Sequence, residues 1–299
     1  MNEKNLIYIA GPTAVGKTKL SIGLAKAFKT EIISCDSRQF FKEMTIGTAV
    51  PTVEEQEGIP HHFLQHKSVK DIYTVGDYEK DAITLLEKLF KKHDTLILVG
   101  GSGMYADAIM FGLDDFPPIP IEVRQQINLF RSTHGIESLQ ELLRNKDPNY
   151  YRVVDRNNPQ RLTRALEVCI ASNKTYSSFL GQEKKPRHFV SKMLILHCPR
   201  KILYENINLR VDNMMAAGLE TEAKNNLDFR EYAPLKTIGY KELMEYFDGN
   251  VSLDDAVNYI KRNTRRYAKR QITWFKKYDN AFCFPANTPV TEVFDLLNQ

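Results

Sequence analysis

The residues best suited to chemistry form the segment GPTAVGKT, Gly11 to Thr18, which matches the phosphate-binding pattern GxxxxGK[ST]. Glycines let the backbone wrap around a phosphate, so that several N–H groups point inward at the start of a helix. Lys17 adds a positive charge, and the hydroxyl of Thr18 is of the kind that binds Mg²⁺. The whole segment, here called the phosphate loop, is predicted to bind a phosphate or diphosphate through Gly11, Pro12, Thr13, Ala14, Val15, Gly16, Lys17 and Thr18.

A carboxylate follows the second apolar run of the chain, at Asp36 in CDSRQ. Many ATPases with this loop instead carry an acid at the end of a later strand, where it holds magnesium and water. Here TLILVGG and MLILHC end without an acid, so a motor or switch NTPase is not expected. Two interpretations stay open: a small-molecule or nucleotide kinase, and an enzyme whose leaving group is a diphosphate.

Short apolar runs alternate with helical patterns around these residues. Strands are predicted at 6–10, 31–35, 95–101 and 192–198, with helices after the phosphate loop and after the third strand. Such alternation is typical of a parallel sheet covered on both faces. The predicted fold class is therefore α/β, a P-loop NTPase-like parallel sheet flanked by helices.

The residue composition changes between the third and fourth predicted strands. The segment GLDDFPPIP, 112–120, contains three prolines and two acids and is interpreted as a linker. The following residues are polar with helical spacing, and the chain after the fourth strand is mostly helical. We predict an α/β core from 1–113 and 188–299, with a helical C-terminal part, interrupted by a helical insertion domain at 114–187.

Composition and charge exclude several classes of protein. With 42% apolar residues the 299-residue chain can form a core, and it has no long apolar run, no signal-peptide pattern and widely spaced cysteines. A cytoplasmic protein without a membrane segment or a structural zinc site is expected. The net charge is only +4, but residues 256–278 contain eight basic side chains and no acid. This basic segment predicts contact with an anionic partner; its cations are Lys261, Arg262, Arg265, Arg266, Lys269, Arg270, Lys276 and Lys277.

An ordered series of motifs extends this pattern over about residues 6–277. After GPTAVGKT come SCDSRQFF, IGTAVP, HHF, VGGSGMY, DRNNPQRLTRALEV, TIGYKE and RRYAKRQITWF. The series resembles the tRNA dimethylallyltransferase family, also called tRNA isopentenyltransferases, in its bacterial form. The resemblance implies transfer of a dimethylallyl group from dimethylallyl diphosphate to an adenine, with Mg²⁺ as cofactor and release of diphosphate. The acceptor would be the exocyclic amine of the adenine 3′ of the anticodon, in tRNAs that read codons starting with U.

The resemblance also implies roles in the reaction. An adenine amine is a poor nucleophile and needs a base to take its proton, and Asp36 matches the family's catalytic aspartate. Lys17, Thr18 with Mg²⁺ and the loop amides would stabilise the departing diphosphate. Ser102 stands where the family usually has threonine, and Arg210 matches an arginine that binds diphosphate. The alternatives are helix N-caps for Asp36 and Ser102, and an ordinary surface arginine for Arg210.

Two segments match tRNA-contacting segments of the family. The first comprises Asp36, Ser37, Arg38 and Gln39, together with Ser102, and the second comprises Gln160, Arg161, Leu162, Thr163 and Arg164, with Arg124 added. For the arginines of the second segment, a solvated face or an ion pair with Glu167 is the alternative. The basic segment would contact RNA phosphates. Tyr240 either lines the path of the adenine or lies in the core.

The chain departs from the family pattern at a few positions. Phe41 replaces a usual tyrosine, and Gln65 and His66 stand where an acid is common. The expected partners are the anticodon stem-loop of tRNA and dimethylallyl diphosphate, with no membrane partner, and a monomer is expected. Besides the kinase, an isopentenyltransferase acting on free AMP or ADP and a non-catalytic RNA-binding protein remain as alternatives.

Overall fold

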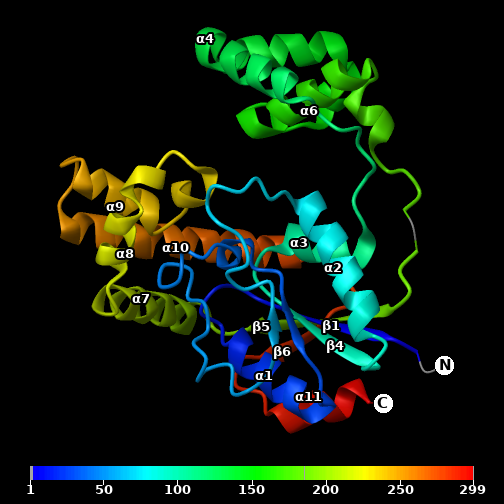
Figure 1. Cartoon of the computed structure of the whole chain (residues 1–299), viewed down its shortest axis with the longest axis vertical. Coiled ribbons are helices and arrows are strands. Elements are labelled where there is room, and N and C mark those ends of the chain that lie inside the picture. The colour runs from blue at the N-terminus through cyan, green and yellow to red at the C-terminus, as the bar shows by residue number, and fades with distance from the viewer. Residues whose placement is uncertain (1–2, 185, 299) are drawn as a thin grey trace. The chain divides into compact units, whose positions relative to one another are not determined.

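The computed structural model describes residues 3–184 and 186–298 (Figure 1). The chain forms two compact units, a larger one from residues before Gly112 and after Pro186, and a smaller one from Gly112–Pro186. No helix within the described ranges is long and apolar enough to cross a bilayer.

The larger unit is built on a six-stranded parallel sheet with the order β3-β2-β4-β1-β5-β6. The predicted parallel α/β sheet is therefore confirmed, although β3 and β6 were not predicted. Its strands are β1 (Asn5–Ala10), β2 (Ile32–Ser34), β3 (His61–His62), β4 (Thr95–Val99), β5 (Val190–His197) and β6 (Phe282–Pro285).

Helices cover both faces of this sheet, which explains why its central strands are apolar at successive positions. On β1, Leu6 and Tyr8 enter one core with residues of α2 and α3, whereas Ile7 and Ile9 enter a second core with α1 and α11. Figure 1 shows α1 and α11 together on one face. The helices are α1 (Lys17–Phe28), α2 (Val75–Leu89), α3 (Gly103–Phe111) and α11 (Val290–Leu297).

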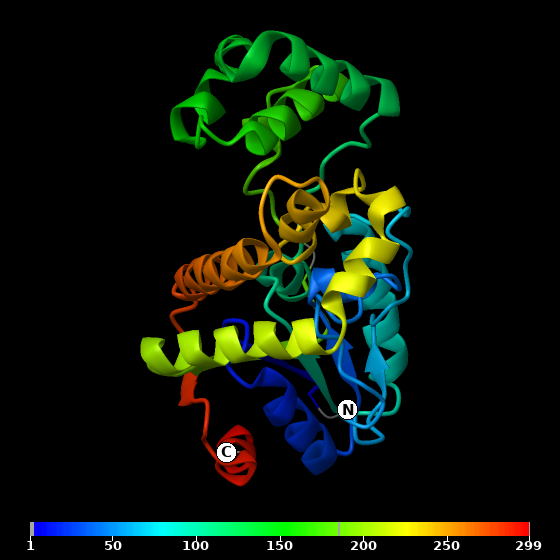
Figure 2. The ribbon, with the colours of Figure 1, turned by 90° about the vertical axis from the view of Figure 1, so that its left-hand side faces the viewer.

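A mostly helical region joins β5 to β6. Helix α7 (Arg200–Ala216) lies alongside the long α10 (Leu253–Phe275), as Figure 2 shows. Helix α10 begins at Ser252, whose side chain accepts from the backbone N–H of Asp255. Between them lie α8 (Leu219–Asn225), η3 (Leu227–Phe229), η4 (Ala233–Lys236) and α9 (Tyr240–Phe247).

The smaller unit is helical and has a core of its own. Leu139 and Leu143 pack with Leu162 and Leu166, and all four are fully buried. The first helix of this unit is kinked at Gly135, where φ is 79°. Its elements are α4 (Ile121–Lys146), α5 (Pro148–Val153), α6 (Pro159–Ser172) and η2 (Tyr176–Phe179).

Candidate active site

The phosphate loop joins the end of β1 to the start of α1 and keeps the first helical amides free. Gly16, with φ of 99°, caps α1 without a side-chain hydrogen bond, and no acid occupies the first turn. At Gly11 a Cβ would lie 2.9 Å from the carbonyl oxygen of Leu196, so the backbones approach too closely for another residue. Ala14 also has a positive φ, 63°. The loop therefore presents backbone N–H groups at a positive helix end, which suits an anion.

The ammonium group of Lys17 lies inside this loop. Its Nζ donates to the carbonyl oxygens of Gly11 and Pro12, each at 2.9 Å. Burial lowers the pKa of Lys17 to about 8, while the nearby Asp36 carboxylate raises that pKa and Arg210 lowers it. An anion bound here would favour the charged form of the lysine.

Asp36 follows the end of β2 and faces the same space as the phosphate loop. Its Oδ1 accepts from the backbone N–H of Arg38 at 3.2 Å and so caps η1 (Ser37–Phe40). Asp36 is therefore a helix N-cap, the alternative role given above, but the cap uses only one of its two carboxylate oxygens. Asp36 also lines the cavity described next, so its second oxygen can serve a ligand there.

One cavity of about 650 Å³ joins these groups. Arg210 of α7 lines it and is partly buried, unlike an ordinary surface arginine. Burial lowers the pKa of Arg210, and the Asp36 carboxylate opposes this shift. The polar lining includes Thr13, Lys17, Thr18, Asp36, Glu55, Asn206 and Arg210, and the apolar lining includes Ile46, Val50, Leu64, Val99, Leu209 and Met214.

Ser102 lies at the start of α3 and binds the Asp36 segment. The backbone N–H of Ser37 donates to Ser102 Oγ at 3.2 Å, and the two hydroxyls are also 3.2 Å apart. On α10, burial first and the Asp36 carboxylate second raise the pKa of Tyr267 to about 12.

The side chain of Gln271 connects α10 to the phosphate loop, which sequence analysis missed. Its Oε1 accepts from the backbone N–H of Thr13 at 2.9 Å, and its Nε2 donates to the carbonyl oxygen of Gly101 at 2.9 Å. A Cβ at Gly101 would lie 2.2 Å from that Nε2. The one signal in the sequence is an uncharged polar residue inside the basic segment, and it indicates no partner.

Arg38 and Gln39 use their side chains on the protein itself. Arg38 Nη2 donates to the carbonyl oxygens of Gly47 and Ile238, at 3.2 and 2.5 Å. Gln39 Nε2 donates to those of Thr48 and Ala49, at 3.3 and 2.8 Å. These bonds fix the segment 47–49, which borders the cavity.

Glu222 of α8 holds the adjoining residues 45–47. Its carboxylate accepts from the backbone N–H groups of Thr45, Ile46 and Gly47 at 2.8–2.9 Å. Tyr240 donates to it at 2.6 Å and is fully buried, so the core alternative is correct for this tyrosine. Glu222 lies 175 residues or more from these amides in sequence, and nothing in its local pattern predicted the contact.

The second predicted tRNA segment lies on α6 of the smaller unit. Gln160 and Arg161 are exposed, whereas Arg164 and Arg124 each lie 3.7 Å from the Glu167 carboxylate, the ion pair weighed above. The side chain of Leu162 is fully buried in the core of this unit, so this residue can offer RNA only its backbone. Thr163 is 8% exposed, so its side chain has little surface to offer RNA.

The described residues contain no cluster of three or more His, Cys, Asp or Glu side chains able to hold a metal ion. His62 instead bonds the Glu31 carboxylate at 2.6 Å. Thr18 and Asp36 both line the cavity, and Mg²⁺ is commonly held by few protein oxygens together with substrate phosphates. These residues therefore fit a magnesium ion that shares oxygens with a bound diphosphate.

Comparison with known proteins gives a consistent result. The model of the IPP transferase family matches residues 39–278. A protein of Flavobacterium johnsoniae named tRNA dimethylallyltransferase is 51% identical over 97% of this chain and 96% of that relative. The tRNA dimethylallyltransferase 1 of Bacteroides fragilis is 45% identical over 93% of this chain and 92% of its own.

Solved structures agree with the sequence relatives. The crystal structure of the tRNA isopentenylpyrophosphate transferase of Bacillus halodurans has a TM-score of 0.71 at 36% identity, covering 99% of this chain and 96% of that chain. A eukaryotic dimethylallyltransferase described as acting on tRNA has a TM-score of 0.86 at 25% identity, covering 99% of this chain and 79% of that chain.

Proposed function

The chain belongs to the IPP transferase family, and from this premise we propose that it transfers a dimethylallyl group from dimethylallyl diphosphate to an adenine amine of tRNA. The single observation that carries the proposal is the shared cavity, in which Asp36 and Arg210 accompany the phosphate loop. A carboxylate and an anion cradle in one space suit a reaction with a weakly nucleophilic amine and a diphosphate leaving group.

The phosphate loop binds the diphosphate in this proposal. Loop amides at the start of α1, the Lys17 ammonium and the Arg210 guanidinium stabilise the charge that develops as the carbon–oxygen bond breaks. The electron pair of that bond stays on the diphosphate. The N–H of Thr13 is already taken by Gln271, so it contributes to loop position and not to phosphate binding.

Asp36 acts as the base. Its free oxygen takes a proton from the exocyclic amine while the new carbon–nitrogen bond forms, which leaves a neutral secondary amine. The bond from Arg38 to the other oxygen keeps the carboxylate oriented. Ser102 supports this segment through its hydroxyl group.

The apolar part of the cavity is suited to the five-carbon group. Ile46, Val50, Leu209 and Met214 line it. Apolar walls also exclude water, which would otherwise compete with the amine as nucleophile. The segment held by Glu222 thus forms part of the prenyl site.

Magnesium is the proposed cofactor, and the Thr18 hydroxyl would be its ligand from the protein. When bound, it neutralises charge on the leaving group. The proposed acceptor is the adenine 3′ of the anticodon, in tRNAs that read codons starting with U. This adenine would have to leave its stack to meet Asp36.

The proposal is tested by incubating the purified protein with dimethylallyl diphosphate, Mg²⁺ and one acceptor at a time. The acceptors are tRNA, an anticodon stem-loop, AMP, ADP and no acceptor, and nucleosides are analysed by mass. We expect a five-carbon addition to one adenosine of the two RNA substrates. Addition to AMP or ADP alone, or phosphate transfer from ATP without RNA, would contradict the proposal.

A further inference from the structure

Residues 45–51, here called the wall segment, form one side of the large cavity without belonging to a helix or a strand. The segment lies between η1 and β3, and the residues of it that line the cavity are Thr45, Ile46, Ala49, Val50 and Pro51. Because no helix or sheet ladder satisfies its backbone, the hydrogen bonds that do so show what holds it in place.

Two of these bonds lie within the wall segment. The N–H of Ala49 donates to the carbonyl oxygen of Ile46 at 2.9 Å, and the N–H of Val50 donates to that of Thr45 at 3.1 Å. They determine the shape of the segment but not its place in the molecule. Its place depends on side chains that come from other parts of the chain.

Glu222 binds three successive N–H groups of the wall segment with one carboxylate. Its Oε2 accepts from Thr45 at 2.9 Å and from Ile46 at 2.8 Å, and its Oε1 accepts from Gly47 at 2.9 Å. The hydroxyl of Tyr240 also donates to Oε1, at 2.6 Å. Hydrogen bonds to a charged acceptor are stronger than neutral ones, so this carboxylate is a firm anchor.

Tyr240 supports both the carboxylate and the wall segment. Burial first, and the Glu222 carboxylate second, raise the pKa of Tyr240, so its hydroxyl keeps the proton that it donates. At Gly47 an added Cβ would lie 2.6 Å from the Tyr240 hydroxyl oxygen, so the backbone there packs directly on this side chain. The wall segment therefore has no room to move toward Tyr240.

Ile46 connects this anchor to the cavity. Glu222 binds its N–H group, while Ile46 itself lines the cavity together with Val50. Neither Glu222 nor Tyr240 is among the described residues that line the cavity. A change at the carboxylate would thus reach a bound ligand only by moving the wall segment.

We propose that Glu222 and Tyr240 are positioning residues that hold the wall segment rigid, so that the site accepts a five-carbon allylic diphosphate and rejects a ten-carbon one. This inference rests on the proposed function. A fixed apolar wall excludes a longer chain by steric clash, whereas a wall that can move repacks around it.

The test compares dimethylallyl diphosphate with geranyl diphosphate, its ten-carbon analogue, as donors to an anticodon stem-loop. Each carboxylate oxygen of Glu222 accepts two of the four bonds, so the NH₂ group of Glu222→Gln meets two donors. The ratio of the two kcat/KM values, five-carbon over ten-carbon, should fall about tenfold. Glu220→Gln removes a carboxylate from the first turn of the same helix and should keep the wild-type ratio. An unchanged ratio in Glu222→Gln would overturn the inference.

Two further variants separate positioning from a general loss of structure. Ile46→Ala shortens the wall but keeps its N–H bond to Glu222, and it should also lower the ratio. Tyr240→Phe leaves the three N–H bonds in place and should lower the ratio less than Glu222→Gln does. An unchanged ratio in Ile46→Ala, or an equal loss of activity with both donors in Glu222→Gln, would refute the proposal.

Binding of the two diphosphates without RNA, measured by calorimetry, distinguishes this inference from the proposed function. The wild type should bind the five-carbon diphosphate more tightly, and Glu222→Gln should lose most of that preference. If this pattern is found but no RNA is prenylated, the proposed function is wrong and the role of Glu222 in donor selection is supported. Equal preference in the wild type and in Glu222→Gln would contradict that role.

Discussion

Burial places the Lys17 ammonium in surroundings that disfavour its charge. Two carbonyl oxygens of the phosphate loop accept its hydrogen bonds, and its pKa falls to about 8. The unfolded chain would hold the lysine proton up to its ordinary pKa of 10.5. The cost of burying the charge is therefore fully present below pH 8 and is relieved as the pH rises.

A rise in pH removes the cost of burying the lysine charge, but it should weaken the binding of a diphosphate. A diphosphate needs the charged lysine, so its affinity should be complete below about pH 8 and should fall above it, by up to about tenfold per pH unit. Calorimetric titration with dimethylallyl diphosphate from neutral to alkaline pH measures this. Lys17→Ala should bind dimethylallyl diphosphate weakly. Its affinity should also lack the decrease above pH 8 that deprotonation of the lysine causes in the wild type. A wild-type affinity that stays constant through the same pH range would contradict the assignment.

Individual residues differ in how far the sequence could predict them. The phosphate loop was recognisable because its chemistry is local, with glycines, lysine and threonine at fixed spacing. The burial of Leu162 was not predicted, because a motif that supplies polar contacts also contains positions that face the core. The roles of Gln271 and Glu222 depend on partners 258 residues and at least 175 residues away, and only the folded chain brings these groups together.

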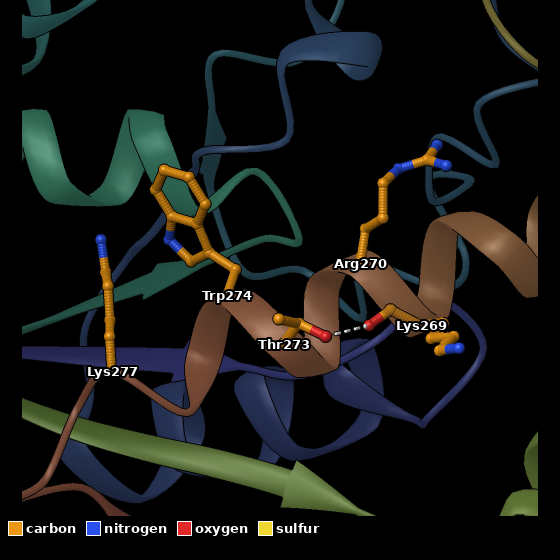
Figure 3. A pocket seen from close by; sticks show the side chains of 5 residues that line it. All are labelled: Lys269, Arg270, Thr273, Trp274 and Lys277. Atoms are coloured by element: carbon orange, nitrogen blue, oxygen red, sulfur yellow. Dashed lines mark hydrogen bonds between the residues drawn. The ribbon is translucent and has the colours of Figure 1, made fainter. Parts of the chain in front are cut away.

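At the scale of elements, helix α10 combines two surfaces. Gln271 is 5% exposed and binds the phosphate loop, whereas Lys269, Arg270 and Trp274, drawn in Figure 3, are exposed. The helix thus connects the phosphate loop to exposed cations of the basic segment, which is predicted to contact RNA.

Replacing Gln271 by leucine should remove the link between helix α10 and the phosphate loop. It leaves the Thr13 N–H and the Gly101 carbonyl without partners, at a cost of about 1–3 kcal/mol each where they stay buried. Urea unfolding should show the loss, and the KM for dimethylallyl diphosphate should rise more than the KM for tRNA. Asn263→Leu is the matched control, since Asn263 lies on the same helix and bonds Glu242 instead. An equal rise of both KM values in Gln271→Leu would contradict a specific effect on the loop.

Strands also show what a pattern can and cannot predict. β1, β4 and β5 were predictable because they are buried on both faces and read as short apolar runs. β3 has two residues, and three of the four residues of β6 are exposed. Short edge strands carry no such run, so their place in the sheet follows from pairing with a neighbour that only the fold supplies.

On the scale of the whole molecule, each of the two units has a hydrophobic core of its own. In the larger unit, the residues that precede and follow the insertion contact one another. Arg187 donates to the carbonyl oxygen of Ala108 at 2.6 Å and pairs with Glu79. The chain therefore leaves the larger unit after Phe111 and returns to it close by.

Joining Phe111 to Arg187 through a short glycine linker should leave the larger unit folded, because it removes no residue of either sheet core. The shortened protein should bind dimethylallyl diphosphate with wild-type affinity and should lose tRNA modification, since the predicted contacts on α6 are gone. Calorimetry and nucleoside mass analysis test the two halves of this expectation. Wild-type modification of tRNA by the shortened chain would show that α6 does not contribute.

The most direct test of the central claim, that Asp36 and the phosphate loop act together on an amine and a diphosphate, is the single-turnover rate of Asp36→Asn. Asparagine keeps an oxygen for the Arg38 N–H and so preserves the cap, but it cannot take the proton. With tRNA and dimethylallyl diphosphate both bound, the rate should fall about 10²–10⁴-fold while tRNA affinity changes little. Glu55→Gln, which removes the other carboxylate of the cavity, should stay near the wild-type rate. A near-wild-type rate in Asp36→Asn would contradict the account.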